Sequence, residues 1–72
     1  MTKKTVVNAM QASGLFHFRR DNDMECYGEN YTACREWLQR HIGEKNVYPW
    51  YDPQEWEIHI EIEGGVAIWC HA

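Results

Sequence analysis

Cysteine and histidine are the residue types in this chain with the widest chemistry, because both bind metal ions and both take part in proton or nucleophile chemistry. The chain contains three Cys and four His. Structural zinc sites present their ligands in closely spaced pairs, such as C-x2-C or H-x3-H, and no such pair occurs here. Cys26 and Cys34 are far apart, and Cys70 and His71 are adjacent on an expected strand, so they point to opposite faces. We therefore expect no metal and no cofactor, and reduced cysteines that are buried as small apolar residues.

A carboxylate–histidine arrangement is the second chemical feature. His59 lies between Glu57 and Glu61, and on a strand these three side chains share one face, with His71 across from Glu57. Such a pair can carry protons. A catalytic pair also needs a pocket that excludes water, and we expect this one on an open sheet face. The sequence therefore favours a protein that is not an enzyme; an enzyme would need a pocket around His59 or His71.

Acidic and aromatic residues gather in the same C-terminal part of the chain. Residues 44–72 carry Lys45 against six acidic residues, whereas residues 1–43 are nearly balanced, and the net charge is -4. We predict a negative face that binds a protein with a basic surface, using exposed aromatic anchors. The predicted binding residues are Tyr48, Trp50, Tyr51, Asp52, Glu57, His59, Glu61, Glu63 and Trp69. The alternative is a solvated face that keeps an edge strand soluble.

A nucleic-acid-binding domain is the second functional hypothesis. Four basic residues of the N-terminal half would form its phosphate-binding patch, and three aromatic or imidazole rings would stack on bases. These are Lys3, Lys4, Arg19 and Arg20 for the patch, and Phe16, His17 and Trp50 for stacking. The acidic C-terminal half disfavours this hypothesis, because it repels phosphates.

The C-terminal acidic residues must be positioned by a hairpin. Apolar residues alternate with polar ones over 56–63, the period of a strand with one buried face, and Gly64-Gly65 then interrupts the pattern. A three-residue loop, Glu63-Gly64-Gly65, would place the apolar residues of one strand opposite the apolar residues of the other. The pairs that it predicts are Ile62 with Val66, Ile60 with Ile68 and Ile58 with Cys70.

Helical spacing occurs in two further segments. Apolar residues recur every three or four positions over residues 31–42, between Asn30 as N-cap and Gly43 as a stop, which predicts the main amphipathic helix. Residues 3–12 fit a short N-terminal helix that ends at Ser13-Gly14, with a strand as the alternative.

A first hairpin is expected from residues 15–19 and 24–27, which flank a turn-rich stretch. Its inward residues would be Phe16, Phe18, Met24 and Cys26. The segment 44–54 contains two prolines and is expected to be an irregular loop. Together these elements predict a single α+β domain, residues 1–72, with a four-stranded and mostly antiparallel sheet, made of two hairpins, under one main helix.

Size sets the remaining expectations. A chain of 72 residues leaves little core for a deep substrate pocket, so a binding surface is favoured over an active-site cavity. The sequence shows no apolar stretch of membrane-spanning length and no secretion signal, and the odd cysteine count favours the cytoplasm. A sheet edge could also support a homodimer.

In size and composition, though in no aligned motif, the chain is similar to small bacteriophage and mobile-element proteins that bind and inhibit host machinery. That resemblance implies an inhibitor or modulator of a host protein, and the negative face predicts that this host protein is basic and handles nucleic acid.

Overall fold

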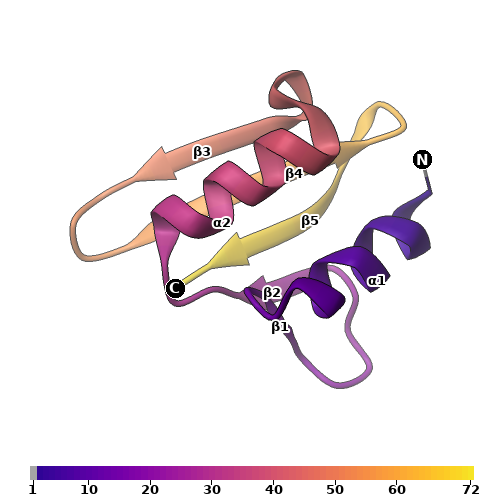
Figure 1. Cartoon of the computed structure of the whole chain (residues 1–72), viewed down its shortest axis with the longest axis horizontal. Helices are drawn as coiled ribbons and strands as arrows, with labels where there is room; N and C mark the ends of the chain where they lie inside the picture. The colour runs from indigo at the N-terminus through magenta and orange to yellow at the C-terminus, as the bar shows by residue number, and fades with distance from the viewer. Residues whose placement is uncertain (1) are drawn as a thin grey trace.

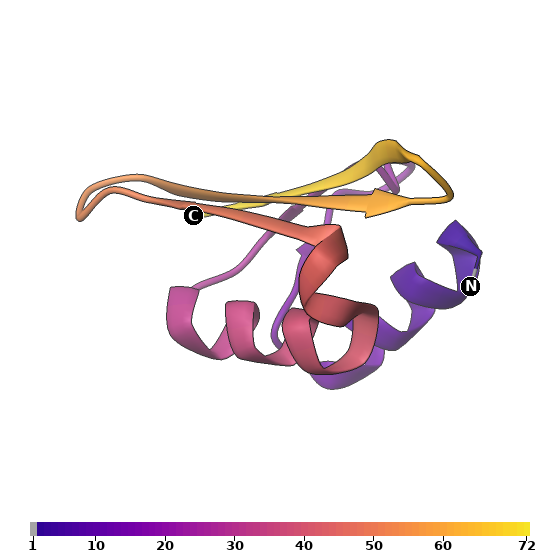
Figure 2. The ribbon, with the colours of Figure 1, turned by 90° about the horizontal axis from the view of Figure 1, so that it is seen from above.

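Within the described part of the chain, five strands form one mixed sheet and two α-helices are present. Figures 1 and 2 show that the helices pack against the same face of the sheet. The computed structural model describes residues 2–72. The elements are α1 (Lys3–Ser13), β1 (His17–Phe18), β2 (Glu25–Tyr27), α2 (Tyr31–Leu38), β3 (Val47–Tyr51), β4 (Trp56–Ile62) and β5 (Gly65–His71). The strand order is β1-β2-β5-β4-β3, in which β2 and β5 are parallel and every other neighbouring pair is antiparallel. The α+β class is as predicted, but the sheet has one strand more than expected and is mixed.

The hydrophobic core lies between the helices and the inner face of the sheet. Alternation along β4 and β5 directs every second side chain inward, and these side chains are buried against one stripe of each helix. The buried residues are Val6, Val7, Met10, Phe16, Cys26, Cys34, Leu38, Val47, Trp56, Ile58, Ile60, Ile68 and Cys70. Because both helices lie on one side of the sheet in Figure 2, no helix within residues 2–72 covers its outer face.

Both helices begin at side-chain caps. The backbone N–H of Thr5 donates to Thr2 Oγ1 at the start of α1, and the N–H of Ala33 donates to Asn30 Oδ1 at the start of α2. Gly14 ends α1 with a φ of 78°, in the left-handed region. The N-terminal helix and the Asn30 cap are therefore confirmed, and the strand alternative for residues 3–12 is wrong.

The main helix changes form before it ends. The α-helical part stops at Leu38, and the chain continues through a wider π-helical turn, Gln39–Gly43. Gly43 has a φ of 106°, and a single 3-10 turn, Glu44–Asn46, then leads into β3. The predicted stop at Gly43 is confirmed, although the last turn is wider than an α-helix.

The first hairpin forms, but it is short. Phe18 pairs with Cys26 across β1 and β2. Met24 was predicted to face inward and is instead 60% exposed, because it precedes β2 and lies in the connecting loop. On its other side β2 pairs in parallel with β5, so that Cys26 lies beside Cys70.

The segment predicted to be an irregular loop, 44–54, contains the strand β3. Val47 is buried and pairs with Ile60, and Pro49 pairs with Ile58. An edge strand has a hydrogen-bonding partner on one side only, so half of its N–H groups point away from the sheet and a proline is tolerated there. Prolines in segment 44–54 therefore do not exclude a strand at the edge of the sheet.

The C-terminal hairpin has the predicted register at one end and a different one at the other. Ile58 pairs with Cys70 and Ile60 with Ile68, as expected. A bulge next to Ile60 then shifts the pairing, so that Ile62 lies opposite Gly65 and not opposite Val66. Only two residues, Glu63 and Gly64, are left for the turn. Their φ values of 56° and 86° are both positive, as a type I′ turn requires.

Candidate functional site

The outer face of the sheet brings together side chains from all five strands. The strand pairing lines them up in two neighbouring rows across the sheet. The first row is Trp50, Glu57, His71, Tyr27 and His17. The second row is Tyr48, His59, Trp69 and Glu25. We call these nine residues the outer-face rows. Both rows contain aromatic or imidazole rings next to a glutamate carboxylate.

Several rings of the outer-face rows stack on one another and remain accessible. The imidazole of His59 stacks on the indole of Trp69, with centroids 5.2 Å apart and an interplanar angle of 21°. The rings of Tyr27 and His71 lie 4.4 Å apart. Even so, Trp69 is 48% exposed and Trp50 is 54% exposed. Ring contacts across the strands hold these side chains in place, while their free faces are open to a partner.

The outer face carries negative charge. Glu25 and Glu57 belong to the outer-face rows, and Glu61 extends the same face along β4. Glu57 Oε2 lies 3.1 Å from His59 Nε2, and both side chains are substantially exposed. A hydrogen bond to the Glu61 carboxylate raises the pKa of the Tyr48 hydroxyl. The outer-face rows contain neither Lys nor Arg.

Three of the predicted binding residues lie away from this face. Tyr51 pairs with the buried Trp56, so it points to the helical side of the sheet, where its ring lies 4.7 Å from that of Tyr31. Asp52 lies in the β3–β4 turn, where its carboxylate accepts from the Gln54 N–H. Glu63 lies in the β4–β5 turn. The predicted residues that do share the outer face are Tyr48, Trp50, Glu57, His59, Glu61 and Trp69.

The contribution of the first hairpin to this face could not be predicted from the sequence. Glu25 pairs with Trp69, and Tyr27 pairs with His71, because β2 and β5 are parallel neighbours. Residues so distant in the chain carry no local signal that they will pair. The alternation of Glu25, Cys26 and Tyr27 indicated which of them face outward, but not which strand lies beside them.

The basic residues of the alternative hypothesis are partly engaged with carboxylates. Lys3 Nζ lies 3.3 Å from Asp23, and Arg19 Nη1 lies 3.9 Å from Glu25. Phe16, expected to stack on bases, is instead buried and packs edge to face on Trp37. A base cannot reach Phe16, so that part of the nucleic-acid hypothesis is wrong.

The cysteines lie together in the core. Cys26, Cys34 and Cys70 are each fully buried and form no disulfide. Hydrogen bonds with the thiols of Cys26 and Cys34, together with burial, raise the pKa of Cys70 far above its ordinary value. Within residues 2–72, no three His, Cys, Asp or Glu side chains are arranged to hold a metal ion.

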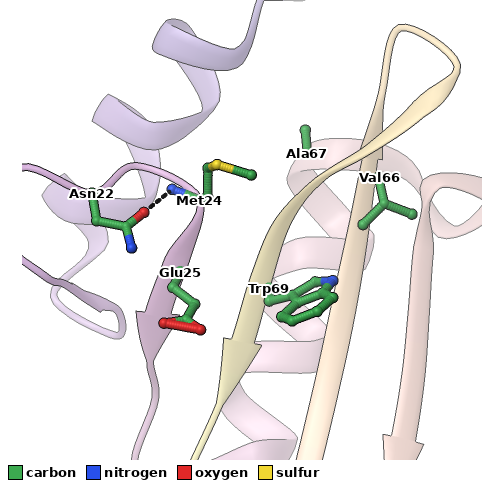
Figure 3. A pocket seen from close by; sticks show the side chains of 6 residues that line it. All are labelled: Asn22, Met24, Glu25, Val66, Ala67 and Trp69. Atoms are coloured by element: carbon green, nitrogen blue, oxygen red, sulfur yellow. Dashed lines mark hydrogen bonds between the residues drawn. The ribbon is translucent and has the colours of Figure 1, made fainter.

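A hollow of about 350 Å³ opens beside the outer face, between the start of β2 and the strand β5 (Figure 3). Its lining residues are Asn22, Met24, Glu25, Val66, Ala67 and Trp69. Met24, Val66 and Trp69 are all markedly exposed, so a concave apolar surface borders the aromatic rows. The backbone N–H of Met24 donates to Asn22 Oδ1 over 2.8 Å, which fixes the loop on one side of the hollow.

Comparisons with protein-family models, with curated proteins and with solved structures found no match to this chain. Among the helices within residues 2–72, none is both long and apolar enough to cross a membrane.

Proposed function

We propose that this chain is a protein-binding module whose outer sheet face binds a basic surface of another protein. The observation that carries the proposal is an uncovered sheet face with exposed aromatic rings and carboxylates, and with no basic side chain in its rows. A face whose purpose was solubility would favour small or charged residues, because exposed tryptophan promotes association. The indoles of Trp50 and Trp69 therefore support binding over the solvated alternative.

The chemistry of the face favours a cationic partner. Large aromatic side chains supply most of the affinity in protein interfaces, and alanine substitution of such an anchor typically costs about 2 kcal/mol or more. Glu25, Glu57 and Glu61 would attract a basic partner and speed its approach. The same carboxylates repel a phosphate backbone, so nucleic acid is the less favoured ligand.

The partner that best fits this charge pattern is a protein that handles nucleic acid. Such a protein carries a basic surface that neutralises phosphates. A negative face that occupies this surface would compete with the nucleic acid, and the chain would then act as an inhibitor or modulator. This role also accords with the resemblance in size and composition to small phage and mobile-element proteins.

The experiment that tests the proposal is a comparative capture from the source cell. Three baits are used: the wild type, the face variant Glu57→Lys with Glu61→Lys, and a control variant, Glu36→Lys with Glu44→Lys. The control carries the same charge change at exposed positions of the helical side. We expect a basic protein that the wild type and the control retain and the face variant loses, and that added DNA or RNA releases. Retention by all three baits would contradict the proposal, and so would tight binding of the wild type to a labelled oligonucleotide.

A further inference from the structure

We propose that the hollow between the start of β2 and β5 binds the side chain of an arginine that a protein partner presents. This inference rests on the proposed function and deepens it, because it names the group that the outer face recognises. The hollow combines an indole, a carboxylate and apolar walls within about 350 Å³.

The indole and the carboxylate are neighbours by strand register. Glu25 on β2 pairs with Trp69 on β5, and in Figure 3 the two side chains point to the same side of the sheet. The Glu25 side chain is 30% exposed, so its carboxylate is partly shielded from water. Partial shielding strengthens the attraction between this carboxylate and a cation that comes to lie beside it.

The remaining walls suit an aliphatic stem. Met24 and Val66 border the same hollow and are 60% and 56% exposed, respectively. The three methylene groups of an arginine can lie along such apolar walls while the charged head stays near water. A methionine adapts its shape easily to the bound group, since its side chain is unbranched and flexible.

Arginine fits this combination better than lysine or a neutral side chain. A guanidinium is planar, so it can lie against the side of the Trp69 indole that His59 leaves open and direct its N–H groups toward the carboxylate of Glu25. An ammonium group is more strongly hydrated and cannot make this paired contact. An anionic ligand is disfavoured, because Glu25 is the one charged residue that lines the hollow.

An arginine of the chain itself already approaches this carboxylate from the opposite side. Arg19 Nη1 lies 3.9 Å from Glu25 Oε2, and the Arg19 side chain is 61% exposed. At this distance the ion pair is weak and readily exchanged. Arg19 directly follows β1, and β1 and β5 lie on opposite sides of β2. Arg19 therefore leaves the Trp69 side of Glu25 open, and it competes with a bound arginine only for the charge of the carboxylate.

The test uses three peptides that differ at one side chain, N-acetyl-Gly-Gly-Xaa-Gly-Gly-amide with arginine, lysine or citrulline as Xaa. Citrulline keeps the shape of arginine and lacks the charge. Binding to the full chain is followed by NMR through the indole N–H of Trp69, which the variant Trp69→Phe identifies. We expect the arginine peptide to bind about five- to tenfold more tightly than the citrulline peptide, the gain typical of a charge-assisted contact, with lysine between them.

Two substitutions should move the arginine affinity in opposite directions. Glu25→Gln should reduce it to the level of the citrulline peptide. Arg19→Ala should raise the affinity for the arginine peptide about two- to threefold, because the exposed Arg19–Glu25 ion pair, worth about 0.5 kcal/mol, no longer competes with the peptide. Arg20→Ala makes the same charge change one residue away and should have the smaller effect. Far-ultraviolet circular dichroism confirms that each variant is folded.

Equal binding of the arginine and citrulline peptides would overturn the inference, and so would an unchanged affinity in Glu25→Gln or tighter binding of a leucine peptide. Equal binding of arginine and lysine would refute arginine recognition in favour of a general cation site. These results do not depend on the capture experiment with the Glu57 and Glu61 variants. A hollow that does not bind arginine can therefore be distinguished from an outer face that does not bind a basic protein.

Discussion

Trp56 and Trp69 lie on opposite faces of the same sheet, so alanine substitutions should have very different effects on stability. Trp56 is 7% exposed and packs in the core, whereas Trp69 is 48% exposed. If a tryptophan side chain presents about 250 Å², these fractions leave about 100 Å² more of Trp69 in water. At 25 cal/mol per Å², that difference is worth about 2.5 kcal/mol.

The cost of each substitution follows from this difference. Truncating a buried tryptophan to alanine costs about 3–5 kcal/mol, because a cavity is left behind. Trp56→Ala should fall in this range, and Trp69→Ala should cost about 1–2 kcal/mol, mainly through the lost stacking on His59. Binding should show the opposite order, since Trp69→Ala removes an anchor of the outer face.

The assay is urea denaturation followed by far-ultraviolet circular dichroism, because the fluorescence itself changes when a tryptophan is removed. A domain of this length has a total stability of about 4–10 kcal/mol, so Trp56→Ala could be largely unfolded. Trp56→Phe then serves as the second variant and should still cost more than Trp69→Ala. A Trp69→Ala variant that loses as much stability as either Trp56 variant would refute the assignment of Trp69 to an open face.

Three further predictions follow from the backbone and the core. Glu63→Asn should raise the free energy of unfolding by about 0.5–1 kcal/mol, because Asn-Gly suits the positive φ of both turn residues, and denaturant titration measures the gain. Gly28→Ala should lower it by about 1–3 kcal/mol in the same titration, since an added Cβ would lie 2.5 Å from Cys34 Sγ; an unchanged midpoint would contradict this packing. The raised pKa of Cys70 keeps its thiol protonated in the folded state, so its contribution to stability is complete below the unfolded thiol pKa, about 8.5, and declines as the pH rises above that value. The hydrogen bond with Cys70 lowers the pKa of Cys34, which acts in the opposite direction, but two adjacent buried thiolates would repel each other, so we expect the decline to prevail. Unfolding at pH 7 and pH 10 tests this, and greater stability at pH 10 would count against it.

The elements that could be predicted from the sequence are those whose signal is local. Asn30 caps the start of the main helix as predicted, and Gly43 ends the helical path, although residues 39–43 form a π-helical turn and not α-helix. The period-two pattern of 56–62 directs Trp56, Ile58 and Ile60 into the core. In each case the cause lies within a few residues of the element.

The features that could not be predicted depend on neighbours distant in the chain. Segment 47–51 differs from these, because its partner β4 follows within a few residues and Val47, Tyr48, Trp50 and Tyr51 all favour strands; only the position of Pro49 at an open sheet edge could not be foreseen. The parallel pairing of β2 with β5 joins Glu25 to Trp69 and thereby forms the hollow. The sequence therefore indicated six of the nine residues of the outer-face rows, those of the C-terminal hairpin and of residues 48–50, and not the three that the first hairpin contributes.

The association rate of the captured partner reports directly whether the outer face binds a basic surface. It is compared by surface plasmon resonance for the wild type, for Glu57→Lys with Glu61→Lys, and for the control Glu36→Lys with Glu44→Lys, at low and high salt. If the outer face binds a basic partner, the face variant should associate at least about tenfold more slowly at low salt than the control. The wild-type rate should also fall as salt is added, because screening shortens the reach of the carboxylates to about 8–10 Å. Equal association rates for the face variant and the control, or a wild-type rate that does not respond to salt, would show that the outer face does not bind a basic partner.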